Sequence, residues 1–158
     1  MPNYFADTSA LAKLYHQEAG SEFMGRIVSA AGSHTFVSHL AMVEMESVLA
    51  LKSRTGEIDK RQFETARRCP RADFRQRRLL MGPPIEPRHL HAARLLLAKY
   101  GATEGLRTLD ALQLAIALDW KDAGRIAVLL AADQRLCRVA ALAGCPAANP
   151  EQPSPSLI

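Results

Sequence analysis

The chain has 158 residues, of which 48% are hydrophobic and 23% charged, and its formal net charge is +4. This length suits one domain, and this composition is typical of a globular protein, which excludes a disordered chain and a coiled coil. No apolar run approaches the ~18 residues of a membrane-spanning helix. The N-terminus lacks the basic and apolar regions of a signal peptide, and the three cysteines have no metal-binding spacing. We therefore expect a reduced, cytoplasmic protein that does not associate with membranes.

The first third of the chain predicts two short strands, because residues 4–6 are apolar and aromatic and residues 35–38, Thr-Phe-Val-Ser, are typical of a short strand. Thr8 or Ser9 can cap the helix that follows the first strand. Hydrophobic periodicity predicts helices between and after these strands, over residues 8–15, 21–31 and 39–54.

In the middle of the chain, Asp59 can cap a helix that runs to about Arg68, where Pro70 is expected to interrupt it. A short strand is predicted over residues 79–81. Pro87 then suits the first turn of the next helix.

The last third predicts a strand between two helices. Thr108 can cap the first helix, and Asp133 begins the second. Between them, residues 126–132 form a continuous apolar run, typical of a strand that is covered on both faces. Strands that alternate with helices predict an α/β fold with a parallel sheet. We assign residues 1–148 to one domain and residues 149–158 to a Pro-rich tail, with fraying expected from Pro146 onward.

The positive charge of the chain is concentrated in residues 61–78. Seven arginines and two acids give this segment a charge of +5, whereas all other residues together carry −1. Such a cluster can attract phosphate backbones. A solvated helix face or a contact with an acidic protein explains the pattern equally well.

Acidic residues stand where α/β proteins place their chemistry. Asp7 and Asp133 directly follow predicted strands, at the sheet edge where ligands bind, and Asp110 lies in the first turn of its helix. Each of these acids alone would stabilise a helix through its macrodipole. Glu44 and Glu46 both have apolar neighbours at helical spacing, and periodicity does not choose between them.

Carboxylates that gather at one place repel one another and raise one another's pKa. A divalent cation removes this penalty, and hard oxygen ligands suit Mg²⁺ or Mn²⁺. Such a cation can activate water and neutralise charge on a phosphate. The five histidines are scattered without zinc-binding spacing.

Several segments resemble PIN-domain ribonucleases, particularly VapC-type toxins of bacterial toxin–antitoxin pairs. The match begins with Asp-Thr-Ser-Ala-Leu, residues 7–11, after the first strand. It includes Leu-Arg-Thr-Leu-Asp-Ala-Leu-Gln-Leu-Ala, residues 106–115. The likeness spans residues 3–149, and its motifs lie in residues 7–11, 38–49, 106–115 and 129–144.

The resemblance implies a three-layer α/β/α sandwich with a small, mostly parallel central sheet. It also implies a metal-dependent endoribonuclease that uses Mg²⁺ or Mn²⁺, acts on RNA, pairs with a cognate antitoxin protein and forms a homodimer. Carried over by residue, it assigns both the catalytic and the metal-binding role to Asp7, Glu44, Asp110 and Asp133.

Within this resemblance, Glu44 is selected over Glu46, and Thr8 and Ser9 can place a hydroxyl beside the metal. Ala131 departs from the family, which often has Thr or Ser two residues before the last acid. This departure leaves the role of Asp133 open.

Two other functions fit an α/β protein with acids at strand ends. A receiver domain or an aspartate phosphatase handles phosphoryl groups, but Ser9 stands where the phosphatase pattern needs a second Asp. The receiver pattern needs adjacent early acids and a Lys after the last strand, and neither is evident. A catalytically inactive PIN-like module that binds RNA or protein is the third hypothesis, and the presence of all four acids argues against it.

Overall fold

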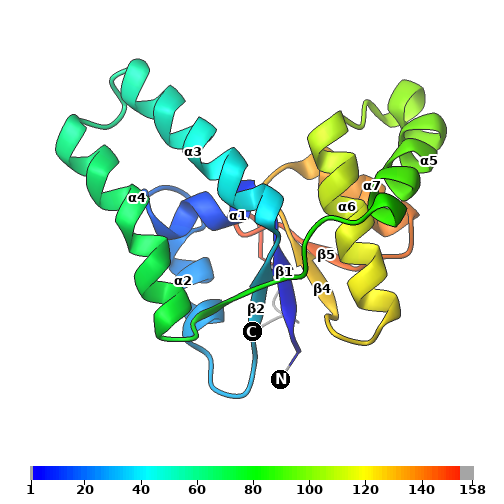
Figure 1. Ribbon diagram of the computed structural model, residues 1–158, viewed down its shortest axis with the longest axis horizontal. Coiled ribbons are helices and arrows are strands. Elements are labelled where there is room, and N and C mark those ends of the chain that lie inside the picture. Colours follow the sequence, from blue (N-terminus) through cyan, green and yellow to red (C-terminus); the bar gives the residue numbers. More distant parts are fainter. Residues whose placement is uncertain (1, 154–158) are drawn as a thin grey trace.

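The structure is a computed structural model that describes residues 2–153 (Figure 1). Within that range, the strands are β1 (Tyr4–Ala6), β2 (Thr35–Val37), β3 (Leu79–Met81), β4 (Val128–Leu130) and β5 (Ala147–Ala148). The helices are α1 (Thr8–Leu11), the 3-10 helix η1 (Ala12–Leu14), α2 (Ser21–Ser29), α3 (His39–Arg54), α4 (Lys60–Arg75), α5 (Pro87–Glu104), α6 (Thr108–Asp122) and α7 (Gln134–Leu142). None of these helices is long and apolar enough to cross a membrane.

The strands form one parallel sheet in the order β3-β2-β1-β4-β5. The chain builds outward from β1 through β2 to β3, then returns to place β4 on the other side of β1. Strand order therefore reverses between β1 and β4. In open α/β sheets, the carboxyl ends of the strands at such a switch point form a ligand-binding crevice.

Alternate residues of β1 enter two different cores, because successive side chains of a strand point to opposite faces. Tyr4 and Ala6 pack with α1 and α2, whereas Phe5 packs with α5, α6 and α7. Trp120 of α6 makes edge-to-face contacts with Phe5 and Phe36. Helices thus cover both faces of the sheet (Figure 1), which confirms the predicted three-layer α/β/α sandwich.

The predicted interruption at Pro70 is wrong, because α4 continues through this residue to Arg75. A proline inside a helix costs about 3 kcal/mol. Pro70 is buried together with Ala66 and Asp73 at helical spacing. Asp73 accepts hydrogen bonds from the Tyr15 hydroxyl and the Arg78 guanidinium, at 2.6 and 2.9 Å. These tertiary contacts hold the second half of the helix in place.

The fraying expected from Pro146 is also wrong for the part of this segment that the structure describes. Ala147 and Ala148 form β5 beside β4. Beyond the strand, Asn149 donates a hydrogen bond to the Ala132 carbonyl, at 3.2 Å, and Glu151 pairs with the buried Lys13 at 2.6 Å. Residues 154–158 lie outside the described part.

Candidate active site

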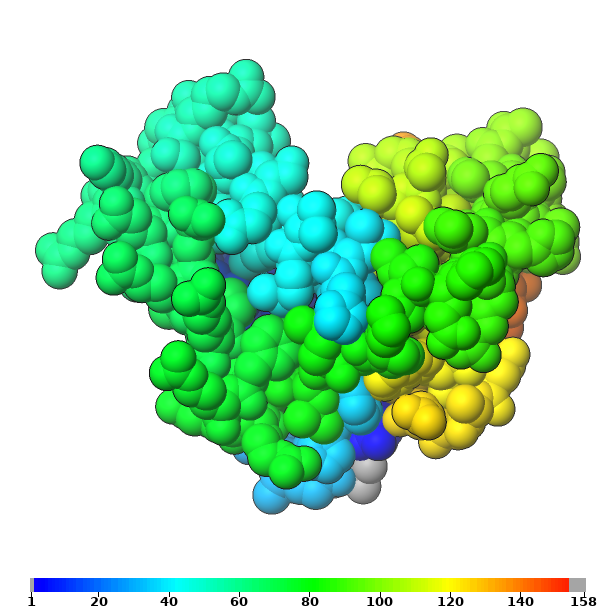
Figure 2. Space-filling model, in the orientation of Figure 1, coloured from blue at the N-terminus to red at the C-terminus, as the bar shows by residue number. Residues whose placement is uncertain are grey.

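A cleft opens at the carboxyl ends of the strands, between α3 and the start of α6 (Figure 2). Glu44 lines it from α3, and residues 107–110 line it from the other side. Figure 1 shows that the two walls belong to different helical layers, with α3 and α4 on one side and α5 and α6 on the other. The cleft therefore lies at the sheet's topological switch point, where the fold predicts a ligand.

Asp7 lies at the end of β1 and is only 4% exposed. Its Oδ1 accepts hydrogen bonds from the Ser9 hydroxyl at 2.7 Å and from the Ala10 amide at 3.0 Å. The pKa of Asp7 is raised to about 7, chiefly by burial and to a smaller extent by the negative charges of Asp110 and Glu44, which together outweigh the hydrogen bonds that lower it. The fold therefore keeps a carboxylate in a place that disfavours its charge.

The cap of α1 is Asp7, not Thr8 or Ser9 as the sequence suggested. The Ser9 hydroxyl has another role, since it also accepts a hydrogen bond from the Ala132 amide, at 2.8 Å. Ser9 thus joins the end of β1 to the segment that follows β4. Ala131, which is fully buried, has no hydroxyl of its own. The hydroxyl that contacts this segment is that of Ser9.

Glu44 is held by Gln113, a buried residue of α6 that sequence reasoning missed. The Gln113 side-chain amide donates to Glu44 Oε1 at 2.9 Å and to the Thr8 hydroxyl at 3.3 Å. Its Oε1 accepts a hydrogen bond from the Ser38 hydroxyl at 2.8 Å. The available signal was a polar residue in an apolar stretch, one helical turn after Asp110.

Glu46 points elsewhere. Its carboxylate pairs with Arg67 of α4 at 2.7 Å, and its side chain is 53% exposed. The structure therefore separates the two glutamates that periodicity left equivalent. Glu44 faces α6 across the cleft, and Glu46 faces α4.

Arg107 is a second residue that sequence reasoning did not select, although it lies within the quoted motif. Its Nε pairs with Asp110 at 2.9 Å, and its Nη2 pairs with Asp133 at 2.8 Å. Burial raises the pKa of Asp110, the bond to Arg107 lowers it, and the charge of Asp133 raises it. The same contacts with Asp110 raise the pKa of Arg107. One guanidinium thus bridges two of the four predicted site acids.

Asp133 uses both carboxylate oxygens. Oδ1 accepts hydrogen bonds from the Arg135 and Leu136 amides, at 2.8 and 3.2 Å, and so caps α7. Oδ2 accepts from Arg107. Asp133 also lines a neighbouring hollow with Ser9 instead of the cleft that contains Glu44 and Asp110.

The acidic side chains are of the type that binds a hard divalent cation, but they do not converge on one point. Within residues 2–153, no three His, Cys, Asp or Glu side chains lie close enough together to hold a metal ion. However, Asp7, Glu44 and Asp110 each keep one carboxylate oxygen without a hydrogen-bond partner among the described residues. Free carboxylate oxygens around one cleft are the donors that Mg²⁺ or Mn²⁺ prefers.

Comparison with known proteins identifies the family of the chain. The family model described as "PIN domain" matches residues 4–142, so the chain belongs to the PIN domain family. No curated protein is significantly similar to it in sequence.

Solved structures share the fold at low sequence identity. VapC20 from Mycobacterium tuberculosis, described as a toxin that cleaves the sarcin-ricin loop, has a TM-score of 0.63 and 19% identity over 96% of this chain and 99% of its own. VapBC2 from Rickettsia felis, bound to a promoter DNA fragment, has a TM-score of 0.62 and 13% identity over 93% and 98%. PAE2754 from Pyrobaculum aerophilum has a TM-score of 0.56 and 20% identity over 87% and 84%. The fold of this chain is therefore that of the VapC structures.

Proposed function

We propose that this protein is a metal-dependent endoribonuclease and the toxin of a cytoplasmic toxin–antitoxin pair. The observation that carries the proposal is the cleft at the switch point of a PIN-domain fold, which Glu44 and Asp110 line and near which Asp7 is buried, each of the three with one carboxylate oxygen free. Asp7 and Asp110 have raised pKa values, so a bound cation would relieve an unfavourable concentration of negative charge.

In this proposal, Asp7, Glu44 and Asp110 would hold Mg²⁺ or Mn²⁺. When bound, the metal would supply a Lewis acid that lowers the pKa of water and offsets the charge of a phosphate under attack. Ser9 fixes the carboxylate of Asp7, and Gln113 fixes that of Glu44. Asp133 completes the site by capping α7 and holding Arg107 at the mouth of the cleft.

RNA, a cognate antitoxin and a second copy of this chain are the proposed partners. The likeness to VapC20, described as a toxin that cleaves the sarcin-ricin loop, supports an RNA substrate. The likeness to VapBC structures from Rickettsia felis and Haemophilus influenzae supports an antitoxin. The homodimer follows from the family resemblance alone.

The proposed site is tested by Asp7→Asn, with Glu46→Gln as the matched control. Asp7→Asn keeps the shape of the side chain but removes the charge that holds a hard cation, so Mg²⁺-dependent cleavage of total RNA should fall below detection. The melting temperature without metal should stay the same or rise, because a buried ionisable group is lost.

Glu46→Gln removes an equal charge from the same helix as Glu44, on a side chain that faces α4. This variant should cleave RNA nearly as well as the wild type. Full cleavage by well-folded Asp7→Asn protein would contradict the proposed site.

A further inference from the structure

Helix α4 carries an unpaired basic face that the proposed active site does not use. This arginine face consists of Arg68, Arg71 and Arg75, which follow one another at helical spacing and are exposed. The face is about 10 Å long at 1.5 Å per residue. Among the described residues, none of the three has an acid within ion-pair distance.

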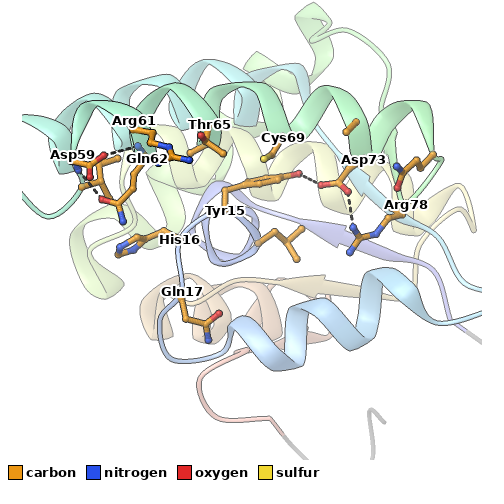
Figure 3. Close-up of a pocket in the computed structure, with 15 residues that line it drawn as sticks. Tyr15, His16, Gln17, Asp59, Arg61, Gln62, Thr65, Cys69, Asp73 and Arg78 are labelled. Atoms are coloured by element: carbon orange, nitrogen blue, oxygen red, sulfur yellow. Dashed lines mark hydrogen bonds and ion pairs between the residues drawn. The ribbon is translucent and has the colours of Figure 1, made fainter.

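Three of the other four arginines of this basic segment have identifiable contacts, and the fourth, Arg77, is exposed beyond the end of α4 without an ion pair among the described residues. Arg67 pairs with Glu46 and lies over the Phe63 ring. Figure 3 shows a pocket between η1 and α4, where Asp73 binds both Arg78 and the Tyr15 hydroxyl. Arg61 also lines this pocket. The inner side of α4 thus packs against the rest of the protein, whereas the arginines on its outer side form no ion pair with other described residues.

The composition of the face favours a nucleic acid over a protein. Protein interfaces depend on buried aromatic and apolar anchors. The large exposed hydrophobic side chains of the described residues lie on other elements, and none lies on α4. A nucleic-acid backbone, in contrast, binds through charge alone.

The face is also connected to the candidate active site. Arg68 and Arg71 line a groove between α3 and α4 together with Arg67 and two acids, Glu46 and Glu64, and the Arg67–Glu46 pair ties the two helices there. Glu44 lies two residues before Glu46 on α3, which forms one wall of the cleft. Figures 1 and 2 show α3 between the cleft and α4.

We infer that Arg68, Arg71 and Arg75 form a docking face for the phosphate backbone of the RNA substrate. This inference rests on the proposed function. An RNA strand whose scissile phosphate lies at Asp7 and Asp110 would leave the cleft across α3 and reach α4. Contact through phosphates would raise affinity for all sequences alike and would not select among them.

The test is Arg68→Gln/Arg71→Gln/Arg75→Gln against a control with the same change in charge, Arg26→Gln/Arg94→Gln/Arg138→Gln. The control arginines are exposed on α2, α5 and α7. Arginine and glutamine have similar helix propensities, so both variants should melt close to the wild type. Affinity for a fluorescent single-stranded RNA is measured in EDTA over a range of KCl concentrations, and cleavage of the same RNA is measured in Mg²⁺.

We expect the arginine-face variant to bind RNA more weakly and with a shallower salt dependence. The slope of log K against log salt should fall by about 2, since each lost single-strand phosphate contact contributes about 0.7. The control variant should keep the wild-type slope.

Three other results would overturn the inference. If the wild type binds and cuts RNA while the two variants have equal slopes, only the docking face is wrong. Polyglutamate serves as a probe for an acidic protein in a parallel titration. If the arginine-face variant keeps its RNA affinity but binds polyglutamate more weakly than the wild type does, the face serves an acidic protein. If the wild type neither binds nor cuts any RNA, the proposed function fails together with the inference.

Discussion

Asp7 has a structural and a proposed chemical role at the same position. Its Oδ1 caps α1, and its buried carboxyl group lies near enough to Asp110 and Glu44 to be affected by their charges. A helix cap stabilises a protein by about 1 kcal/mol, whereas a buried charge without a counter-ion opposes folding. The raised pKa of Asp7 shows that burial outweighs the hydrogen bonds from Ser9 and Ala10.

This balance predicts how stability without metal depends on pH. The pKa of Asp7 is about 7 in the folded protein and about 3.9 in an unfolded chain. The folded state therefore binds a proton more tightly. The stability that this protonation contributes is fully present below pH ~4 and is lost as the pH rises to about 7.

Chemical denaturation in EDTA at pH 5 and pH 8 measures this effect. The wild type should lose a few kcal/mol more than Asp7→Asn between these two values, because the variant has no carboxyl group to ionise. Parallel losses in the two proteins would show that Asp7 is not the group responsible.

At the scale of elements, one side chain connects the starts of α6 and α7. Arg107 is the N-cap residue of α6 and reaches Asp133, the N-cap of α7, as well as Asp110. The guanidinium supplies the positive charge that the acids require when no metal is bound. A cation bound at the free oxygen of Asp110 would compete with Arg107 for the negative charge of this carboxylate.

Arg107→Gln should therefore bind Mn²⁺ more tightly than the wild type and be less stable without metal. Exposed ion pairs contribute ~0.2–1 kcal/mol each, so the gain in Mn²⁺ affinity should reach up to about tenfold. Titration calorimetry with Mn²⁺ and thermal unfolding in EDTA measure the two effects.

Arg135→Gln is the matched control for Arg107→Gln. The Arg135 guanidinium contacts the Gly105 carbonyl, and its charge lies near Asp110 without a direct ion pair. If both variants change Mn²⁺ affinity equally, general charge explains the effect, and direct competition by Arg107 is wrong.

Elements were predictable from sequence where local signals agreed. Short strand-like stretches predicted β1, β2 and β4, and hydrophobic periodicity predicted α3 over residues 39–54. Local signals failed where distant residues decide the outcome. Pro70 is tolerated in α4 because Tyr15, 58 residues away from Asp73 in the sequence, binds Asp73, and β5 forms because β4 is beside it.

The same distinction applies to the candidate site. Asp7, Asp110 and Asp133 could be selected because they follow strands or begin helices, which are local features of the sequence, whereas Glu44 was selected over Glu46 only through the family resemblance. Gln113 could not be selected in this way, since its partners Ser38 and Thr8 are 75 and 105 residues away. Arg107 gains its role only when the fold brings Asp133 to within reach of α6.

For the whole molecule, strand order explains why acids that are distant in sequence share one region. The sheet places β1 beside β4, so Asp7 and Asp133 follow neighbouring strands. The two helical layers then add Glu44 from α3 on one side and Asp110 from α6 on the other (Figure 1). The proposed nuclease function depends on a cation that joins these layers.

Metal dependence of RNA cleavage by the wild-type protein tests the central claim most directly. The purified protein is incubated with a fluorescent RNA in Mg²⁺ or Mn²⁺, then with excess EDTA, and again after the metal is restored. The account predicts cleavage with either metal, none in EDTA and recovery afterwards, because the carboxylates act on RNA only through a bound cation. Cleavage that persists at full rate in EDTA would contradict the account, even if the protein is a ribonuclease.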